Sequence, residues 1–184
     1  MPYPQQQNRI LPDIIPDTVP LRLLLCGYNP GDTSAKRGHY YAHAGNWFWR
    51  VLHRVGLTPT RLLPEEDRGI TEYGIGLTDL LKTSKHSDGA MPRAEDIARL
   101  RALVLRHQPQ LKILAFAGKA KPAECFFGYP VGWGDTGERI GTTAIWVVPS
   151  TSPKNASKYQ NSNHRYWGHW HDLAHEFHKL KGTK

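Results

Sequence analysis

The chain has 184 residues, a length typical of one domain with short tails and sufficient to bury a substantial core. Its 24 Lys and Arg residues outnumber its 16 Asp and Glu residues, and the resulting formal charge of +8 favours a polyanionic partner. Two cysteines, Cys26 and Cys125, allow at most one disulfide, exclude a four-thiolate zinc or iron–sulfur site within one chain, and indicate a reducing compartment.

The N-terminal segment, residues 1–19, contains four prolines and three consecutive glutamines, which leaves little scope for helix or sheet hydrogen bonding. We predict an extended arm here. The segment lacks the charged flank and compact apolar stretch of a signal peptide, and no later apolar run approaches the roughly 20 residues that span a bilayer. We therefore expect a cytoplasmic location without membrane contact.

Apolar runs and amphipathic stretches alternate along the remaining chain. Short apolar runs bounded by Gly, Pro or polar residues predict buried strands at residues 21–27, 74–81, 111–118 and 142–150. Helical spacing of apolar residues predicts helices after a cap at Asn46, at 94–107, around 120–126 and at about 165–180. This order indicates an α/β fold, a three-layer α/β/α sandwich with a short, mostly parallel sheet of four or five strands. The domain should cover residues 20–180, with a tail at 181–184.

Three polar loops follow predicted strands, and ligands bind beyond the carboxyl ends of the strands in sheets of this kind. These loops are Gly27–Gly38, Thr78–Asp88 and Pro149–Tyr159. We expect the functional site where they meet.

The first of these loops begins with GYNPG, which holds Asn29 at a bend between Tyr28 and Pro30 and lets a ligand approach the backbone at the glycines. The loop is neither a Walker loop nor a dinucleotide fingerprint. From this motif alone, a turn asparagine without a catalytic role remains the alternative.

Two aromatic residues, Tyr40 and Tyr41, follow the cations Lys36 and Arg37 in the same region. Aromatic rings that stack on bases, beside cations that meet phosphates, are typical of nucleic-acid binding. Core packing and solvated charge are the alternative interpretation of each residue taken singly.

Five segments occur in a recognisable order: GYNPG, SAKRGHYYAHAGNWFWRVLHRVGLTP, GIGLTDLL, AGKA and IWVVPSTSPKNA. Together they resemble the mismatch-specific uracil/thymine-DNA glycosylase family of the uracil-DNA glycosylase superfamily, over roughly residues 21–177. The resemblance implies hydrolysis of the N-glycosidic bond of uracil, or of a related deaminated or mismatched base, flipped out of DNA. It implies no metal or organic cofactor, a monomer that binds damaged or mismatched DNA, and nucleoid association if the source is bacterial.

The resemblance also assigns roles within the first motif. Asn29 matches the asparagine that positions the attacking water, so the predicted catalysis rests on orientation and electrostatics. Tyr41 matches the aromatic that stacks on the flipped base, and backbone groups of Tyr28 and Tyr41 match those that bind the base edge. Ser34 and Gly31 complete the expected base pocket.

The second motif, Ser150 to Tyr159, matches the segment that enters the duplex and grips phosphates. Pro153 and Lys154 replace the more usual glycine and apolar wedge. The residues expected at the DNA are Lys36, Arg37, Ser150, Ser152, Lys154, Asn155 and Lys158, with Asn155 reaching towards the widowed base.

Asp79 departs from the family pattern, because many relatives carry a neutral or basic residue at this place in GLTDL. A carboxylate here can orient water or stabilise a cationic sugar, as in glycosidases. The alternative is a carboxylate that caps the loop at the strand end. We predict catalytic roles for both Asn29 and Asp79.

The sequence also allows other functions and sites. A glycosylase directed at hypoxanthine, xanthine or thymine, and an inactive DNA-binding relative, remain as alternatives. His171, His175 and His178 share one predicted helix face but lack the H-E-x-x-H pattern, so we expect a solvated face and no metal site. The tryptophans of the predicted helices should belong to the core.

Overall fold

Five strands form one central sheet in the order β2-β1-β3-β5-β4 in this computed structural model, which describes residues 10–82 and 90–180. Strands β1 (Leu23–Gly27), β2 (Ile75–Asp79), β3 (Ile113–Ala117) and β5 (Thr143–Val148) are parallel. Strand β4 (Gly134–Ile140) runs antiparallel to β5 at the edge. All four parallel strands therefore end at the same edge of the sheet.

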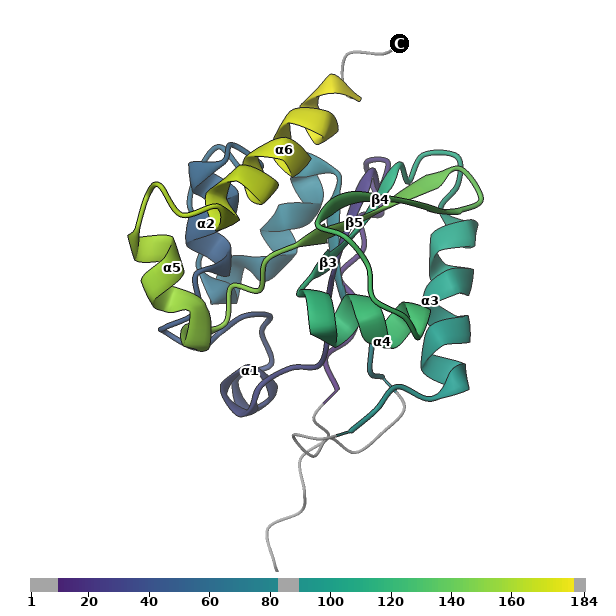
Figure 1. Cartoon of the computed structure of the whole chain (residues 1–184), viewed down its shortest axis with the longest axis horizontal. Coiled ribbons are helices and arrows are strands. Elements are labelled where there is room, and N and C mark those ends of the chain that lie inside the picture. Colours follow the sequence, from purple (N-terminus) through teal and green to yellow (C-terminus); the bar gives the residue numbers. More distant parts are fainter. Residues whose placement is uncertain (1–9, 83–89, 181–184) are drawn as a thin grey trace, which may run out of the picture.

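Helices cover both faces of this sheet (Figure 1). One face carries α2 (Phe48–Arg54), α6 (Tyr166–Lys179) and the 3₁₀ helix η1 (Pro64–Tyr73). The other carries α3 (Ala94–Arg106) and α4 (Glu124–Phe127). The predicted three-layer α/β/α sandwich is confirmed.

The central strand β1 is apolar throughout because it is buried on both faces. Leu23 and Leu25 pack into the core beneath α2 and α6, whereas Leu24 and Cys26 pack into the core beneath α3 and α4. Cys26 is thus a small buried residue, as expected, and both cysteines are free.

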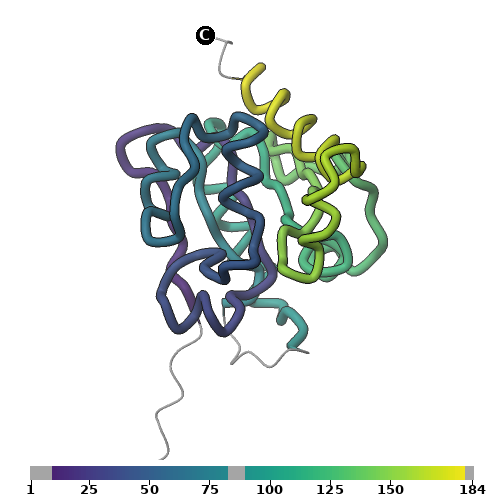
Figure 2. Tube along the Cα trace, turned by 90° about the vertical axis from the view of Figure 1, so that its left-hand side faces the viewer, coloured from purple at the N-terminus to yellow at the C-terminus, as the bar shows by residue number. Residues whose placement is uncertain are grey.

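Short helices occupy the loops at the carboxyl edge of the sheet. These are α1 (Asp32–Arg37), the π-helical turn η2 (Lys119–Ala123), the 3₁₀ turn η3 (Pro153–Asn155) and α5 (Ala156–Gln160). In both Figures 1 and 2, α1 lies at the end of the molecule opposite the C-terminal end of α6. These loops carry the polar motifs of the sequence, which therefore lie together at the carboxyl edge of the sheet.

The edge strand β4 and the helix η1 were not predicted. Strand β4 alternates between partly buried and exposed residues and contains Gly134 and Gly137, so its sequence resembles a polar loop. Its pairing comes from the neighbouring β5, where Asp135 lies beside Trp146 and Arg139 beside Ala144. Tertiary pairing, which a local pattern does not encode, decides this element.

The N-terminal segment joins the domain from Ile10 onward, which corrects the predicted boundary between an arm at 1–19 and a domain at 20–180. Ile14 forms an antiparallel bridge with Leu77 through backbone hydrogen bonds of 2.9 and 2.8 Å. Leu11 and Ile14 are only 4 % and 5 % exposed. The burial of the apolar side chains of Leu11, Ile14 and Ile15 stabilises this segment against the sheet, although prolines lie among these residues. The predicted positions of residues 1–9 and of the tail at 181–184 lie outside the described residues.

None of the described helices combines the length and apolar character that crossing a bilayer requires.

Candidate active site

A cleft of about 580 Å³ opens at the carboxyl edge of the sheet, where β1, β2, β3 and β5 end. Its lining comprises Leu11, residues 27–34, Tyr40, Tyr41, His43, Asn46, Asp79, Ala117, Lys121 and residues 150–154. The cleft lies beside the switch between β1 and β3, where the chain connections diverge and α/β sheets bind their ligands. Parts of all three predicted loops meet there, although residues 83–89 of the loop Thr78–Asp88 lie outside the described residues.

The register of β1 and β2 brings the first two motifs together. Gly27 pairs directly with Asp79. Beyond the strands, the Leu80 N–H donates to the Gly27 carbonyl and the Leu81 N–H to the Tyr28 carbonyl, each at 2.9 Å. These bonds hold the backbone of GYNPG beside that of GLTDL, so Asn29 emerges two residues beyond the partner of Asp79.

Gly27 is required because two functional side chains converge on it. A Cβ built at this position would overlap Asp79 Oδ1 and would lie 3.1 Å from the Tyr41 hydroxyl. The missing side chain therefore lets the carboxylate and the phenol reach the cleft from two different elements.

We expect Gly27→Ala to lower the free energy of unfolding by about 1–3 kcal/mol, the usual cost of overpacking a buried site, and to displace Asp79. Denaturant unfolding followed by tryptophan fluorescence measures the effect. Gly168→Ala is the control, because a Cβ at this exposed position in α6 meets nothing within 4 Å. Equal stability of Gly27→Ala and the unaltered protein would contradict the close packing.

Three buried polar atoms in the cleft lining have no hydrogen-bond partner in the described structure. They are the Tyr41 hydroxyl, Asp79 Oδ2 and Thr151 Oγ1, and they are three of seven such atoms among the described residues. Buried polar groups are normally paired, so an unpaired set in one cleft indicates a place for water or a ligand. The half-buried amide of Asn29 lies in the same lining and has no hydrogen-bond partner among the described residues.

Asp79 is only 3 % exposed, and burial raises the pKa of its carboxyl group to about 6. Lys82 and Arg99 lower the pKa, whereas Asp13 raises it. A carboxylate with this pKa is ionised at neutral pH and still accepts a proton readily. It is therefore suited to contact with water or with a developing positive charge.

Tyr41 is held at the cleft by its own strained backbone and by its neighbours. Its φ angle is 52°, in the left-handed region, and one ring face stacks on Phe48 with centroids 3.7 Å apart. The next residue, Ala42, donates its N–H to the buried Ser34 Oγ at 2.9 Å, and Arg37 Nη1 donates to the Ala42 carbonyl at 3.0 Å. Ser34 and Arg37 thus fix the loop that presents Tyr41.

The second motif forms a compact turn over the cleft. Asn155 Nδ2 donates to the Ser150 carbonyl at 3.1 Å, and the Ser152 N–H donates to Ser150 Oγ at 3.3 Å. The Thr151 carbonyl accepts from the Trp47 N–H at 2.9 Å, which joins the turn to the start of α2. Lys154 is exposed at the mouth of the cleft.

Comparison with known proteins places this architecture in one group. The model of the uracil DNA glycosylase superfamily matches residues 15–174 of the chain. The chain belongs to the uracil DNA glycosylase superfamily. A solution NMR structure of a proposed uracil DNA glycosylase from Methanosarcina acetivorans is similar, with 21 % identity and a TM-score of 0.59 over 93 % of this chain and 98 % of that one. At that identity the likeness shows the fold alone.

Nine residues that the sequence assigns to a site of this superfamily line the cleft. They are Tyr28, Asn29, Gly31, Ser34, Tyr41, Asp79, Ser150, Ser152 and Lys154. The geometry therefore gathers the predicted catalytic and base-pocket residues in one place.

Four predicted DNA contacts are not in the cleft lining. Lys36 is exposed beside the cleft. Arg37 pairs with Glu65, and Asn155 bonds within its turn. Lys158 Nζ donates to Asn155 Oδ1 at 3.2 Å and to the Tyr166 hydroxyl at 3.0 Å. In this structure Arg37, Asn155 and Lys158 thus hold the loops beside the cleft in place.

Several lining residues were not found from the sequence. Lys121 comes from the loop after β3, and its Nζ lies 5.2 Å from the centre of the Tyr28 ring. The rule that ligands bind at strand carboxyl ends applies to this loop too, so AGKAKPA carried a usable signal. Asn46 lines the cleft, and its Oδ1 accepts the Phe48 N–H at 3.0 Å, but the N-cap of α2 is Trp47, one residue after the predicted cap.

The histidines and tryptophans of the C-terminal helix occupy opposite sides. His171, His175 and His178 are exposed, and within residues 10–82 and 90–180 no three potential ligands gather as a metal site would require. Trp167 and Trp170 are buried in the core, as predicted.

Proposed function

We propose that this chain is a monofunctional DNA glycosylase of the mismatch-specific uracil/thymine type, which removes uracil or a related deaminated or mismatched base flipped out of DNA. The observation that carries the proposal is the placement of Asn29 and Asp79 in one cleft beside the aromatic ring of Tyr41. Membership of the superfamily and the charge of +8 support DNA as the substrate.

In the proposed reaction the C1′–N bond breaks and its electron pair leaves with the base. Positive charge grows on the deoxyribose while negative charge grows on the base, and a water oxygen forms the new bond to C1′. The Asn29 amide orients this water. The ionised Asp79 stabilises the cationic sugar and takes up the proton that water releases, a role that suits a buried carboxylate with a pKa of about 6.

The rim of the cleft suits a single nucleotide drawn out of a duplex. Tyr41 offers an aromatic surface for the base, and base stacking of this kind contributes about 1–3 kcal/mol. Lys154 and Lys121 line the cleft from the loops after β5 and β3, and their positive charges suit the flanking phosphates. We expect the protein to act as a monomer, because one chain supplies every part of this arrangement.

We expect Lys154→Ala to reduce the slope of log affinity against log salt by about one unit, because one phosphate contact is lost, and to leave base preference unchanged. Fluorescence anisotropy with a labelled duplex at several salt concentrations measures the slope. Lys112→Ala is the matched control, since this exposed lysine precedes β3 at the opposite edge of the sheet. Equal slopes for the two variants would show that Lys154 does not contact a DNA phosphate.

A base-release assay tests the proposed function. Labelled single- and double-stranded oligonucleotides that carry uracil, thymine mispairs, hypoxanthine or xanthine are incubated with the protein and cleaved with alkali at abasic sites. Release of uracil supports the proposal, and release of only another base changes the substrate within the same reaction class. Tight binding without abasic product from any oligonucleotide would identify an inactive DNA-binding relative.

A further inference from the structure

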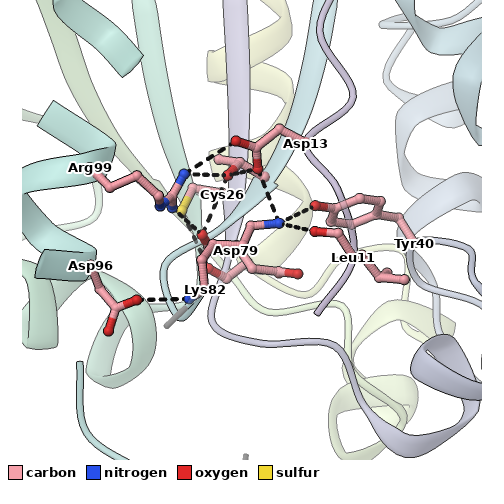
Figure 3. A network of polar contacts seen from close by, with 10 residues as sticks. Leu11, Asp13, Cys26, Tyr40, Asp79, Lys82, Asp96 and Arg99 are labelled. Carbon is pink, nitrogen blue, oxygen red and sulfur yellow. Dashed lines mark hydrogen bonds and ion pairs between the residues drawn. The ribbon is translucent and has the colours of Figure 1, made fainter. Parts of the chain in front are cut away.

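A network of charged side chains lies directly behind the cleft and joins three segments of the chain (Figure 3). Asp13 from the N-terminal segment accepts hydrogen bonds from the Thr78 hydroxyl at 2.6 Å and from Arg99 Nη1 at 3.2 Å. Its Oδ1 also lies 3.0 Å from Lys82 Nζ. One carboxylate thus holds two cations, one from α3 and one from the loop after β2.

The network is attached to the backbone of Asp79. Arg99 Nη2 donates to the Asp79 carbonyl at 2.6 Å, and Thr78, which binds Asp13, is the residue before Asp79. The backbone on both sides of the Asp79 Cα is therefore fixed by side chains that Asp13 holds. The direction in which the Asp79 side chain leaves the strand depends on this attachment.

Lys82 extends the same network to the cleft wall. Its side chain is 9 % exposed, and Nζ donates to the Tyr40 hydroxyl at 2.9 Å and to the Leu11 carbonyl. Tyr40 and Leu11 both line the cleft. The Lys82 N–H donates to Asp96 Oδ1 at 2.8 Å, which ties the loop after β2 to the start of α3.

We propose that Asp13 is a positioning residue of this active site: by holding Lys82 and Arg99 against the carboxyl end of β2, it sets the orientation and the charge environment of Asp79. The proposal rests on the proposed function for its link to catalysis. It gives the N-terminal segment a part in the site, which its composition alone did not indicate.

Several titratable groups near Asp79 carry no charge at physiological pH. Burial raises the pKa of Cys26 on β1 and of Tyr40 and Tyr41 in the loop after α1, so all three remain neutral at physiological pH. The charged groups of the described residues that act on Asp79 are then Asp13, Lys82 and Arg99.

These three charges act on Asp79 with opposite signs. Asp13 favours the protonated form of the Asp79 carboxyl group, whereas Lys82 and Arg99 favour the ionised form. If Asp13 holds Lys82 and Arg99 in place, its replacement removes one unfavourable charge but also releases two favourable ones, so the pKa of Asp79 must rise, as it must when the Arg99 charge is removed. If Asp13 acts only as a nearby charge, its replacement must lower the pKa of Asp79. General loosening of the site would admit water and lower this pKa in both variants, because burial is the main cause that raises it.

The test is a carbon-13 NMR titration of the Asp79 carboxyl group in the full chain, with the signal assigned by its loss in Asp79→Asn. We expect the titration midpoint to rise in both Asp13→Asn and Arg99→Gln, and to return towards that of the unaltered protein in Arg99→Lys. Asp17→Asn is the control, because it removes the same charge from an exposed position in the same segment. Asp13→Glu, which keeps the charge but lengthens the side chain, replaces Asp13→Asn if that variant does not fold, and its midpoint should rise by a smaller amount.

The pH profile of base release supplies the catalytic readout. About one pH unit below the midpoint, the unaltered enzyme keeps roughly a tenth of its plateau rate, and at that same pH Asp13→Asn and Arg99→Gln should both keep less. An Asp79 midpoint that is the same in every variant, or that falls in Asp13→Asn, would overturn the positioning role. Shifted NMR midpoints in a protein that releases no base would instead overturn the proposed function and leave the positioning intact.

Discussion

Asn29→Ala is expected to lower the single-turnover rate of base release by on the order of a hundredfold, the usual effect of losing one preorganised electrostatic donor, or about 3 kcal/mol of transition-state stabilisation. The amide lies in the cleft wall two residues beyond Gly27 and has no hydrogen-bond partner among the described residues, so it is available to hold water. An amide does not remove a proton at neutral pH, and the loss should therefore be nearly independent of pH.

The measurement is a quench-flow time course with enzyme in excess over a labelled duplex that contains uracil. DNA affinity should change little, since the amide orients water and is not expected to contact phosphate. Asn163→Ala, at an exposed position in the loop before α6, is the control for the substitution itself. A single-turnover rate within a few-fold of the unaltered enzyme would leave Asn29 as a turn residue.

Much of the fold was predictable because its parallel strands are buried on both faces. Apolar runs such as LRLLLCG identify such strands without tertiary information, and the alternation with amphipathic helices gives the layers. Strand β4 and the docked segment from Ile10 to Pro20 were missed for the opposite reason. Both are half-exposed and polar or proline-rich, and each is fixed by pairing with a buried strand, β5 in the case of β4 and β2 in the case of the N-terminal segment.

The site was predictable as a set of loops, but the sequence did not show how each side chain is used. Asn29, Tyr41 and Asp79 line one cleft because Asp79 ends β2 and the other two lie in the segment after β1, and both strands end at one edge of the sheet. Whether a lysine or an asparagine faces DNA or braces its own loop depends on side-chain geometry. Asn155 and Lys158 bind each other and their turn, which no spacing in PSTSPKNASKY indicates.

Asp79→Asn is expected to lower the single-turnover rate near pH 8 by at least tenfold, within the range that general acid–base groups contribute. The unaltered enzyme should lose activity below about pH 6, because the buried Asp79 is protonated there. The rate of the variant should not fall below pH 6 through protonation of this group, because Asn does not titrate. Rates measured from about pH 5 to pH 8 give both the loss and the change in profile.

The same substitution separates catalysis from loop capping through its effect on stability. A capping carboxylate accepts backbone N–H groups, as Asp96 does from Lys82 and Arg93 and as Asp67 does from Tyr40. No hydrogen bond among the described residues ends on either carboxylate oxygen of Asp79, so its removal breaks no cap.

Linkage then gives the sign of the stability change. The folded pKa of Asp79, about 6, lies above the ordinary carboxyl value, so the folded state binds the extra proton and this group costs stability increasingly as pH rises from about 4 to 6. Above that range the cost is on the order of 3 kcal/mol, and Asp79→Asn removes it. We therefore expect the variant to unfold at higher denaturant concentration than the unaltered protein near pH 8 and to lose this advantage near pH 4. A variant that is less stable at both pH values and retains full activity would assign Asp79 to capping and leave Asn29 as the principal catalytic side chain.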